Sequence, residues 1–266
     1  MVVAAQEQGG WPGWRVFGLI LGAMVCARTC AMAFNRIVDR KFDELNPRTA
    51  ARHLPSGQIS LVSAWTLCLA SGLGLIAASY FINSLCFWLS PVALTVICFY
   101  SLTKRFTDFT HFYLGAALAL APIGAWLAVR GEFGLQPLVL ALVVITWLVG
   151  FDIIYALQDY EFDRKHGLHS LVVRWGAKNA LMFAFLSHMV MWGLLGVFGL
   201  ISKFRVAYLA GLLIILGSLL LEHWLARRRS LKWINVAFFR LNALISMVFL
   251  VVTVTEVVFP RFKLFR

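Results

Sequence analysis

Long apolar runs alternate with short polar stretches along the whole chain. Each run approaches the 20 or so residues that a helix needs to cross a hydrocarbon core about 30 Å thick. The runs are continuous, and a backbone in lipid must satisfy its own hydrogen bonds, so the pattern favours helices over a barrel of strands. The predicted spans are 15–34, 59–80, 84–102, 111–130, 135–157, 179–200, 206–225 and 236–258.

The composition agrees with this pattern, because 61% of the residues are hydrophobic and only 14% are charged. Soluble domains are about half apolar. No stretch between the runs is long enough for a soluble domain. The sequence therefore predicts an all-α, polytopic transmembrane bundle that forms a single domain over residues 1–266.

The net charge of +12 raises the question of a nucleic-acid partner, but the positions of the basic residues indicate membrane topology instead. If the loop over 36–58 is cytoplasmic, the inside loops carry roughly twice as many Lys and Arg as the outside segments, as the positive-inside rule requires. We therefore expect no nucleic-acid partner, contact with membrane lipid, both termini outside, and the acidic loops on the cytoplasmic side of the inner membrane.

The acidic residues gather in two short regions on that predicted cytoplasmic side, which hold seven of the chain's twelve Asp and Glu. The sequence NRIVDRKFD at 35–43 matches YALQDYEFD at 155–163, at an offset of 120 residues. Both regions follow a span that runs inward, and both precede a basic loop. The match therefore predicts a parallel internal repeat of four helices per half.

Each region predicts a column of polar side chains, because residues four apart on a helix share one face and rise about 6 Å. The two columns are Asn35, Asp39 and Asp43 in the first region, and Tyr155, Asp159 and Asp163 in the second. An ionisable residue also lies inside each apolar span: Arg28 is seven residues before Asn35, and Asp152 is seven residues before Asp159. Charges are costly in lipid, so we expect both to face a shared polar cavity, where Asp152 could also pair with Arg28.

Four converging carboxylates repel one another unless a cation neutralises them. Mg²⁺ prefers oxygen ligands, and it takes one or two protein carboxylates while leaving its other positions to water and substrate phosphate. Two facing clusters therefore predict a site for a metal-bridged diphosphate. The basic residues Arg48, Arg52, Lys104 and Arg105 are candidates to contact the remaining phosphate oxygens.

These motifs resemble those of the UbiA superfamily of membrane-embedded aromatic prenyltransferases. The first family signature, NxxxDxxxD, reads NRIVDRKFD here, and the loop ELNPRTAARHLPSG that follows is similar to that of 4-hydroxybenzoate polyprenyltransferases. The second signature, DxxxD, appears as DYEFD, and the third, YxxxK, appears as YSLTK. The three signatures stand in the family's order, and the likeness covers nearly the whole chain.

The resemblance implies Mg²⁺-dependent transfer of a prenyl group from a polyprenyl diphosphate to an aromatic carboxylic acid. The acceptor would be 4-hydroxybenzoate, prenylated on the ring carbon ortho to its hydroxyl in ubiquinone biosynthesis. Arg28 would pair with the acceptor's carboxylate, while Asp152 or Tyr155 would remove the ring proton or orient the phenol. The remaining implied roles are metal and diphosphate binding by Asn35, Asp39, Asp43, Asp159 and Asp163, and phosphate binding by Arg48, Arg52 and Lys104 beside Tyr100.

The chain departs from the family at its start. Family members usually have nine transmembrane helices, whereas MVVAAQEQGGWP is similar only to the end of the first one and the loop after it. We expect eight spans, with the first family helix truncated and its part of the lipid-facing wall missing.

Two other functions fit parts of the pattern. Similar sequences prenylate 1,4-dihydroxy-6-naphthoate in a menaquinone pathway, and that acceptor also offers a carboxylate to Arg28. A cation-coupled transporter would also have repeats and membrane acids, but its acids lie near the midplane, on helices interrupted by Gly or Pro. Here the acids lie at helix ends, which favours the enzyme.

Overall fold

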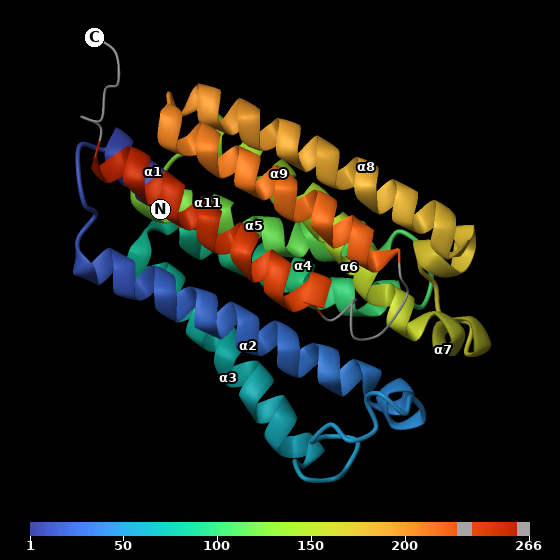
Figure 1. Ribbon diagram of the computed structural model, residues 1–266. Coiled ribbons are helices and arrows are strands. Elements are labelled where there is room, and N and C mark those ends of the chain that lie inside the picture. The colour runs from blue at the N-terminus through green and yellow to red at the C-terminus, as the bar shows by residue number, and fades with distance from the viewer. Residues whose placement is uncertain (228–235, 260–266) are drawn as a thin grey trace.

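The computed structural model describes residues 1–227 and 236–259 of the chain. Every regular element within those ranges is helical, so the predicted all-α class is confirmed. Part of the basic run Arg227-Arg228-Arg229 and the C-terminal tail, both counted in the topology argument, lie outside the described residues. The helices form one elongated bundle (Figure 1).

The elements, in chain order, are α1 (Val2–Glu7), α2 (Trp14–Leu45), α3 (Leu61–Ile82), α4 (Ser84–Thr103), α5 (Thr110–Arg130), α6 (Leu135–Ala156), the 3₁₀ turn η1 (Leu157–Asp159), α7 (Tyr160–Lys165), α8 (Leu171–Ile201), α9 (Val206–Ala226), the π-helical segment η2 (Val236–Leu241) and α11 (Asn242–Val258). Among the described residues, eight helices are long and apolar enough to cross a membrane, which matches the eight predicted spans. The chain is therefore an integral membrane protein.

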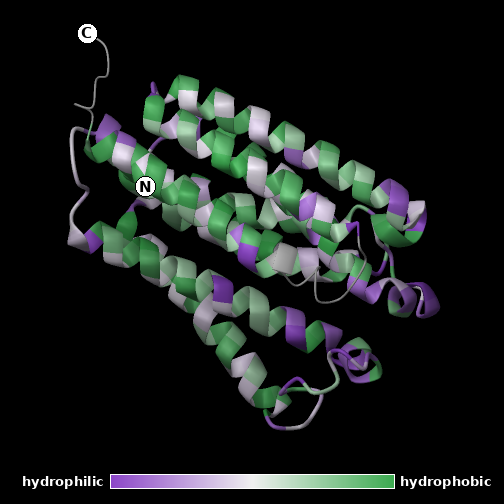
Figure 2. Cartoon of the chain, viewed as in Figure 1, coloured by the Kyte–Doolittle hydropathy of each residue, from purple (hydrophilic) through white to green (hydrophobic). Residues whose placement is uncertain are grey.

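Polar residues gather at one end of this apolar bundle (Figure 2). That end carries α7 and the loop between α2 and α3, while α1 and the last turns of α11 lie at the opposite end (Figure 1). Side-chain caps start several helices, as when the Ser60 hydroxyl accepts a hydrogen bond from the amide of Ser63 at the start of α3. The sequence therefore separates a lipid-facing body from one polar end.

The two halves pack in the same order. In the first half α2 packs on α3, α3 on α4 and α4 on α5, and in the second α6 packs on α8, α8 on α9 and α9 on α11. The halves meet where α5 packs against α6. This is the neighbour order that a parallel four-helix repeat predicts.

The core lies mainly in the second half. Buried apolar side chains from α6, α8, α9 and α11 form its main clusters. Within the apolar window of each motif helix, 44% of the α6 residues are buried, but only 17% of the α2 residues. The backbones of α6 and α8 approach closely at Gly150, where a Cβ would stand 2.4 Å from the His188 ring. The second motif is thus attached to a packed helix, and the first to a helix at the edge of the bundle.

One prediction about the second motif is wrong. The residues Tyr155, Asp159 and Asp163 do not form a column on one continuous helix, because α6 ends at Ala156 and the tighter turn η1 precedes α7. A 3₁₀ turn has three residues per turn in place of 3.6, so it rotates the following side chains away from the expected face. The first motif remains on the unbroken helix α2, as predicted.

Candidate active site

A polar cavity of about 200 Å³ opens at the polar end of the bundle. Its walls combine both acidic motifs with the loop after α2 and the end of α4. Of the residues predicted for the site, the lining includes Asn35, Asp39, Asp43, Arg48, Arg52, Tyr100, Lys104, Asp152, Tyr155, Asp159 and Asp163. The folding of the chain therefore brings together residues from four separate segments of the sequence.

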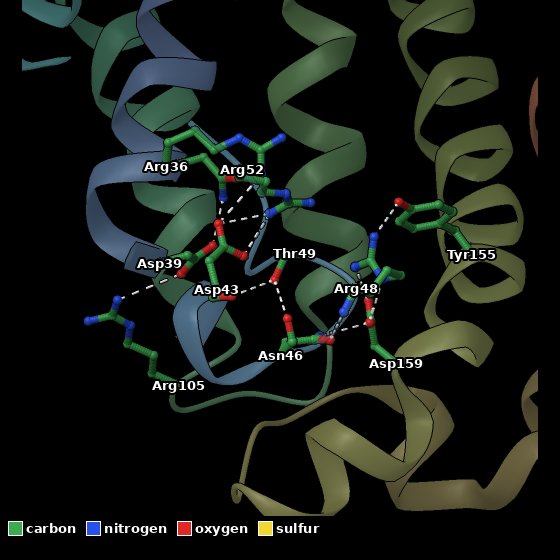
Figure 3. Close-up of polar contacts among 11 residues, drawn as sticks. Arg36, Asp39, Asp43, Asn46, Arg48, Thr49, Arg52, Arg105, Tyr155 and Asp159 are labelled. Carbon is green, nitrogen blue, oxygen red and sulfur yellow. Dashed lines mark hydrogen bonds and ion pairs between the residues drawn. The ribbon is translucent and has the colours of Figure 1, made fainter. Parts of the chain in front are cut away.

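The first motif forms one wall of this cavity from the last three turns of α2. The Asn35 amide donates a hydrogen bond of 2.9 Å to Asp39, which holds the two polar side chains side by side. One turn further on, Asp43 is 7% exposed and accepts two hydrogen bonds, of 2.7 and 2.8 Å, from the single nitrogen Nη1 of Arg52. Arg105 lies 3.7 Å from Asp39 (Figure 3).

Arg48 connects the two motifs. It follows the first motif along the chain, yet its Nε and Nη2 donate hydrogen bonds of 2.8 and 2.5 Å to the two carboxylate oxygens of Asp159 (Figure 3). Its Nη1 donates to the hydroxyl of Tyr155 at 2.9 Å. Burial would lower the pKa of the Arg48 guanidinium, but the bonds and charge of Asp159 outweigh it and raise the pKa above its usual value. Arg48 therefore stays charged and spans the cavity.

Lys104 occupies the centre of the acidic residues. Its ammonium lies 3.6 Å from Asp163, which is only 2% exposed and whose Oδ2 is buried without a hydrogen bond among the described residues. Burial would lower the pKa of Lys104, but the carboxylates of Asp163, Asp152 and Asp159 raise it above its ordinary value. The second motif thus has a cationic partner in Lys104, at the end of α4.

Asp152 pairs with a partner that the sequence did not indicate. Its Oδ2 lies 2.6 Å from Nδ1 of His111, near the start of α5, and that imidazole is fully buried. The alternative that Asp152 pairs with Arg28 is therefore wrong. His111 lies at an element boundary 41 residues away, so no spacing within either motif could have related it to Asp152.

Arg28 does not line the cavity, contrary to the prediction. It lies two turns deeper on α2 than the first motif, and the residue is exposed. Its guanidinium is nevertheless close enough to act electrostatically on the Tyr100 hydroxyl, as the Asp152 carboxylate does. The acceptor-binding role of Arg28 therefore stays a prediction.

Asn46 is a site residue that the sequence analysis missed. Its side chain is 8% exposed, donates to Asp159 at 3.1 Å and accepts from the backbone amide of Arg48 at 3.0 Å. It caps the end of α2 and precedes Pro47, so its position marks a helix end that must turn sharply. The dipeptide Asn46-Pro47, three residues after the first motif, was the sequence signal that could have predicted this helix end and its capping residue.

The donor set fits Mg²⁺ by its chemistry. The motif side chains offer carboxylate and amide oxygens, which are the ligands that Mg²⁺ prefers, and Asp163 has a buried oxygen without a hydrogen bond. Among the described residues, however, no three acidic, His or Cys side chains are gathered closely enough to hold a metal as they stand. Arginine and lysine side chains occupy the space between the carboxylates.

The chain matches the model of the UbiA prenyltransferase family over residues 1–244. It is 34% identical over 226 residues to the 4-hydroxybenzoate octaprenyltransferase of Alcanivorax borkumensis, an alignment that covers 84% of this chain and 77% of that relative.

Solved structures share the fold. The apo structure of a UbiA homolog from Aeropyrum pernix K1 superposes with a TM-score of 0.87 at 27% identity, covering 96% of this chain and 94% of that one. A UbiA homolog from Archaeoglobus fulgidus, bound to GPP and Mg²⁺, superposes with a TM-score of 0.71 at 23% identity, covering 95% and 93%.

Proposed function

Because the chain belongs to the UbiA prenyltransferase family, and is therefore an aromatic prenyltransferase, we propose that it transfers a polyprenyl group from a polyprenyl diphosphate to the ring carbon ortho to the hydroxyl of 4-hydroxybenzoate. The reaction would serve ubiquinone biosynthesis and use Mg²⁺. The observation that carries the proposal is the cavity at the polar end, where the two acidic motifs face each other across basic side chains.

The charges in the cavity support a metal diphosphate as ligand. Each motif carboxylate has a cationic neighbour at present, and the pairs are Asp39 with Arg105, Asp43 with Arg52, Asp159 with Arg48, and Asp163 with Lys104. A diphosphate with Mg²⁺ brings charges of both signs, so the carboxylates can exchange their cations for the metal while the cations move to phosphate oxygens. Neither set of buried charges is then left without a partner, which would cost several kcal/mol.

Different residues of the chain then have different roles in the reaction. Mg²⁺, when held by the motif oxygens, supplies positive charge that stabilises the diphosphate as it leaves. Arg48, Arg52 and Lys104 donate hydrogen bonds to the phosphate oxygens as the allylic C–O bond breaks. The apolar helices around the prenyl chain exclude water, which would otherwise capture the allylic cation.

The acceptor would lie deeper than the diphosphate. Arg28 lies two turns deeper on α2 than the first motif and would pair with the carboxylate of 4-hydroxybenzoate, while Tyr100, Asp152 and Tyr155 line the cavity itself. The ring carbon ortho to the hydroxyl attacks the cation, and the ring then loses its proton. We propose that this chemistry takes place at the cytoplasmic face of the inner membrane, since the basic loops adjoin this end.

The relative's name favours 4-hydroxybenzoate over 1,4-dihydroxy-6-naphthoate. Family membership and the position of the acids at helix ends disfavour cation-coupled transport.

Purified protein in lipid nanodiscs, supplied with Mg²⁺, a labelled polyprenyl diphosphate and either acceptor, tests all three functions. We expect label in prenylated 4-hydroxybenzoate, and its loss when EDTA removes the metal. Transfer to the naphthoate alone would show that the naphthoate is the acceptor in place of 4-hydroxybenzoate. Transfer to neither would refute the proposal.

A further inference from the structure

We propose that His111 is a positioning residue that orients Asp152 as the base which takes the ring proton of the aromatic acceptor, an inference that rests on the prenyl transfer proposed above. The pair joins two helices, α5 and α6, at the point where the two halves of the bundle meet. Only one member of the pair reaches the cavity, because Asp152 lines it whereas His111 is fully buried behind it.

The contact fixes one oxygen of the carboxylate and leaves the other available. Oδ2 of Asp152 lies 2.6 Å from Nδ1 of His111, and no hydrogen bond from the described residues reaches Oδ1. The Asp152 side chain is 21% exposed, and that exposure is to the cavity it lines. A carboxylate held by one oxygen in a fixed direction presents its second oxygen as an acceptor, which is the geometry that a general base requires.

The environment of the imidazole favours one of its two tautomers. Nε2 of His111 is buried and has no hydrogen-bond partner among the described residues. A proton on Nε2 would therefore be a buried donor left unsatisfied, which costs about 1–3 kcal/mol. The tautomer with its proton on Nδ1 avoids that cost and donates to Asp152. His111 thus acts through the orientation of Asp152 and does not touch the acceptor.

The alternative base in the cavity is Tyr155, and the structure disfavours it. Its hydroxyl oxygen already accepts a hydrogen bond from Arg48 at 2.9 Å, and Arg48 also holds Asp159 on the diphosphate side. A neutral phenol in that position can orient a ligand, but a carboxylate is the stronger proton acceptor. Asp152 also lines the same cavity as Lys104 and Tyr100, so it is within reach of a ligand that occupies this cavity.

The proton transfer balances without any additional reagent. The allylic C–O bond breaks, and its electron pair leaves with the diphosphate. A π electron pair of the ring forms the new C–C bond, so the ring carries a positive charge, with the hydrogen and the prenyl group on one carbon. Oδ1 of Asp152 then takes that hydrogen as a proton, and the C–H electron pair restores the aromatic ring. The proton leaves through the polar cavity after the product.

A kinetic isotope effect tests this role directly. The wild type and His111→Leu are compared in nanodiscs with 4-hydroxybenzoate that carries either hydrogen or deuterium at both carbons ortho to the hydroxyl. We expect His111→Leu to lower kcat by about 10²-fold, the lower end of the contribution of a general base. The KM for the polyprenyl diphosphate should stay within about twofold, since Asp152 does not hold the diphosphate in this proposal. A primary isotope effect on kcat should appear in the variant, because proton removal becomes slow.

His111→Asn and His111→Gln separate orientation from general loss of structure. The Asn amide can donate near the position of Nδ1, while the Gln amide reaches past it toward Nε2. We expect Asn to recover much of kcat and to abolish the isotope effect, and Gln to do neither. This comparison decides the question even if His111→Leu does not fold. His188→Leu serves as the matched control, because it removes another buried imidazole that bonds to His223 and the Trp147 carbonyl, away from the cavity.

The outcomes are distinguishable. A wild type that prenylates no aromatic acid refutes the proposed function. A wild type that is active, with His111→Leu at normal kcat, or with equal activity and isotope effects in the Asn and Gln variants, refutes the positioning role alone. An isotope effect that appears equally in His188→Leu would attribute the change to loosened packing and would also overturn the role of His111.

Discussion

The two acidic motifs space their aspartates identically, but the helices that carry them pack differently in the bundle. The first lies on the unbroken helix α2, where only 17% of the apolar window is buried. The second follows the packed helix α6 and is bent by the 3₁₀ turn η1 before α7 begins. A repeated sequence has thus produced one straight wall at the edge of the bundle and one bent wall at its core.

The partners of the carboxylates differ in the same way. Asp43 is held by Arg52 from the loop that follows it, so the first motif is largely stabilised by its own segment. Asp159 is held by Arg48 and Asn46, more than 100 residues earlier in the chain. The first half therefore supplies the groups that hold the second motif in position, and the site depends on how the halves assemble.

The largest effects should come from neutralising one carboxylate in either motif. We expect Asp39→Asn and Asp159→Asn each to reduce kcat by about 10³-fold, because each removes a preorganised charge from the diphosphate site. Labelled prenyl transfer in nanodiscs measures the rate, and size-exclusion profiles with thermal unfolding report the fold.

Exposed acids beside each motif provide matched controls. Glu44 directly follows the first motif and Glu161 lies within the second, and neither lines the cavity. Glu44→Gln and Glu161→Gln should keep rates within about twofold of the wild type, since surface charges contribute little. Near-normal turnover in Asp39→Asn or Asp159→Asn would remove that residue from the metal site.

The next effect should distinguish the two arginines of the loop after α2. Arg48 uses two different nitrogens to bind both oxygens of Asp159, whereas Arg52 reaches Asp43 through one nitrogen only. A lysine can replace a contact made by one nitrogen, but it cannot replace an arginine that binds both carboxylate oxygens through two nitrogens. We expect Arg48→Lys to lower kcat/KM for the polyprenyl diphosphate by about tenfold or more, and Arg52→Lys to lower it by less than about threefold. Equal losses of kcat/KM in the two variants would mean that the two-nitrogen contact of Arg48 has no special role.

The sequence predicted the parts of the site that depend on local spacing. The eight spans follow from hydrophobic length, and the polar column on α2 follows from a four-residue period on one straight helix. It did not predict the turn η1, because the second motif has the same spacing as the first and contains neither Gly nor Pro to mark a break. The His111–Asp152 contact and the reach of Arg48 to Asp159 were also missed, since both depend on tertiary packing between distant segments.

The helices that follow the two motifs give a smaller, purely structural contrast. After the first motif, α3 runs from a Ser60 cap, whereas α8 contains a kink at Gly176, with φ of +75°. With ψ of 158° this is a region that only glycine adopts readily, and a side chain there costs about 1–3 kcal/mol. Gly176→Ala should therefore lower the unfolding temperature in detergent by a few degrees. Gly196→Ala, in a regular part of α8 with open space at the Cβ position, should be neutral or stabilising. Equal unfolding temperatures for the two variants would show that α8 can straighten.

The smallest expected effect concerns the loop that ties the second motif to α4. Asp108 accepts hydrogen bonds from Arg174 at 2.8 Å and His169 at 3.0 Å, next to the loop that leaves α7. Burial would raise the pKa of Asp108, but these bonds and charges bring the pKa below its ordinary value of 3.8. A depressed pKa stabilises the fold above pH 3.8, and that contribution disappears as the pH falls through the lower, folded-state pKa.

Asp108→Asn should consequently lower the unfolding temperature slightly at pH 7, by the equivalent of less than about 1 kcal/mol, because the pair is near the surface. The difference from the wild type should shrink as the pH falls below 4, where the wild-type carboxyl also loses its charge. Unfolding scans of both proteins between pH 3 and pH 7 measure it. A difference that stays constant over this range would assign the effect to packing of the loop, and the electrostatic tie between α4 and the second motif would have to be abandoned.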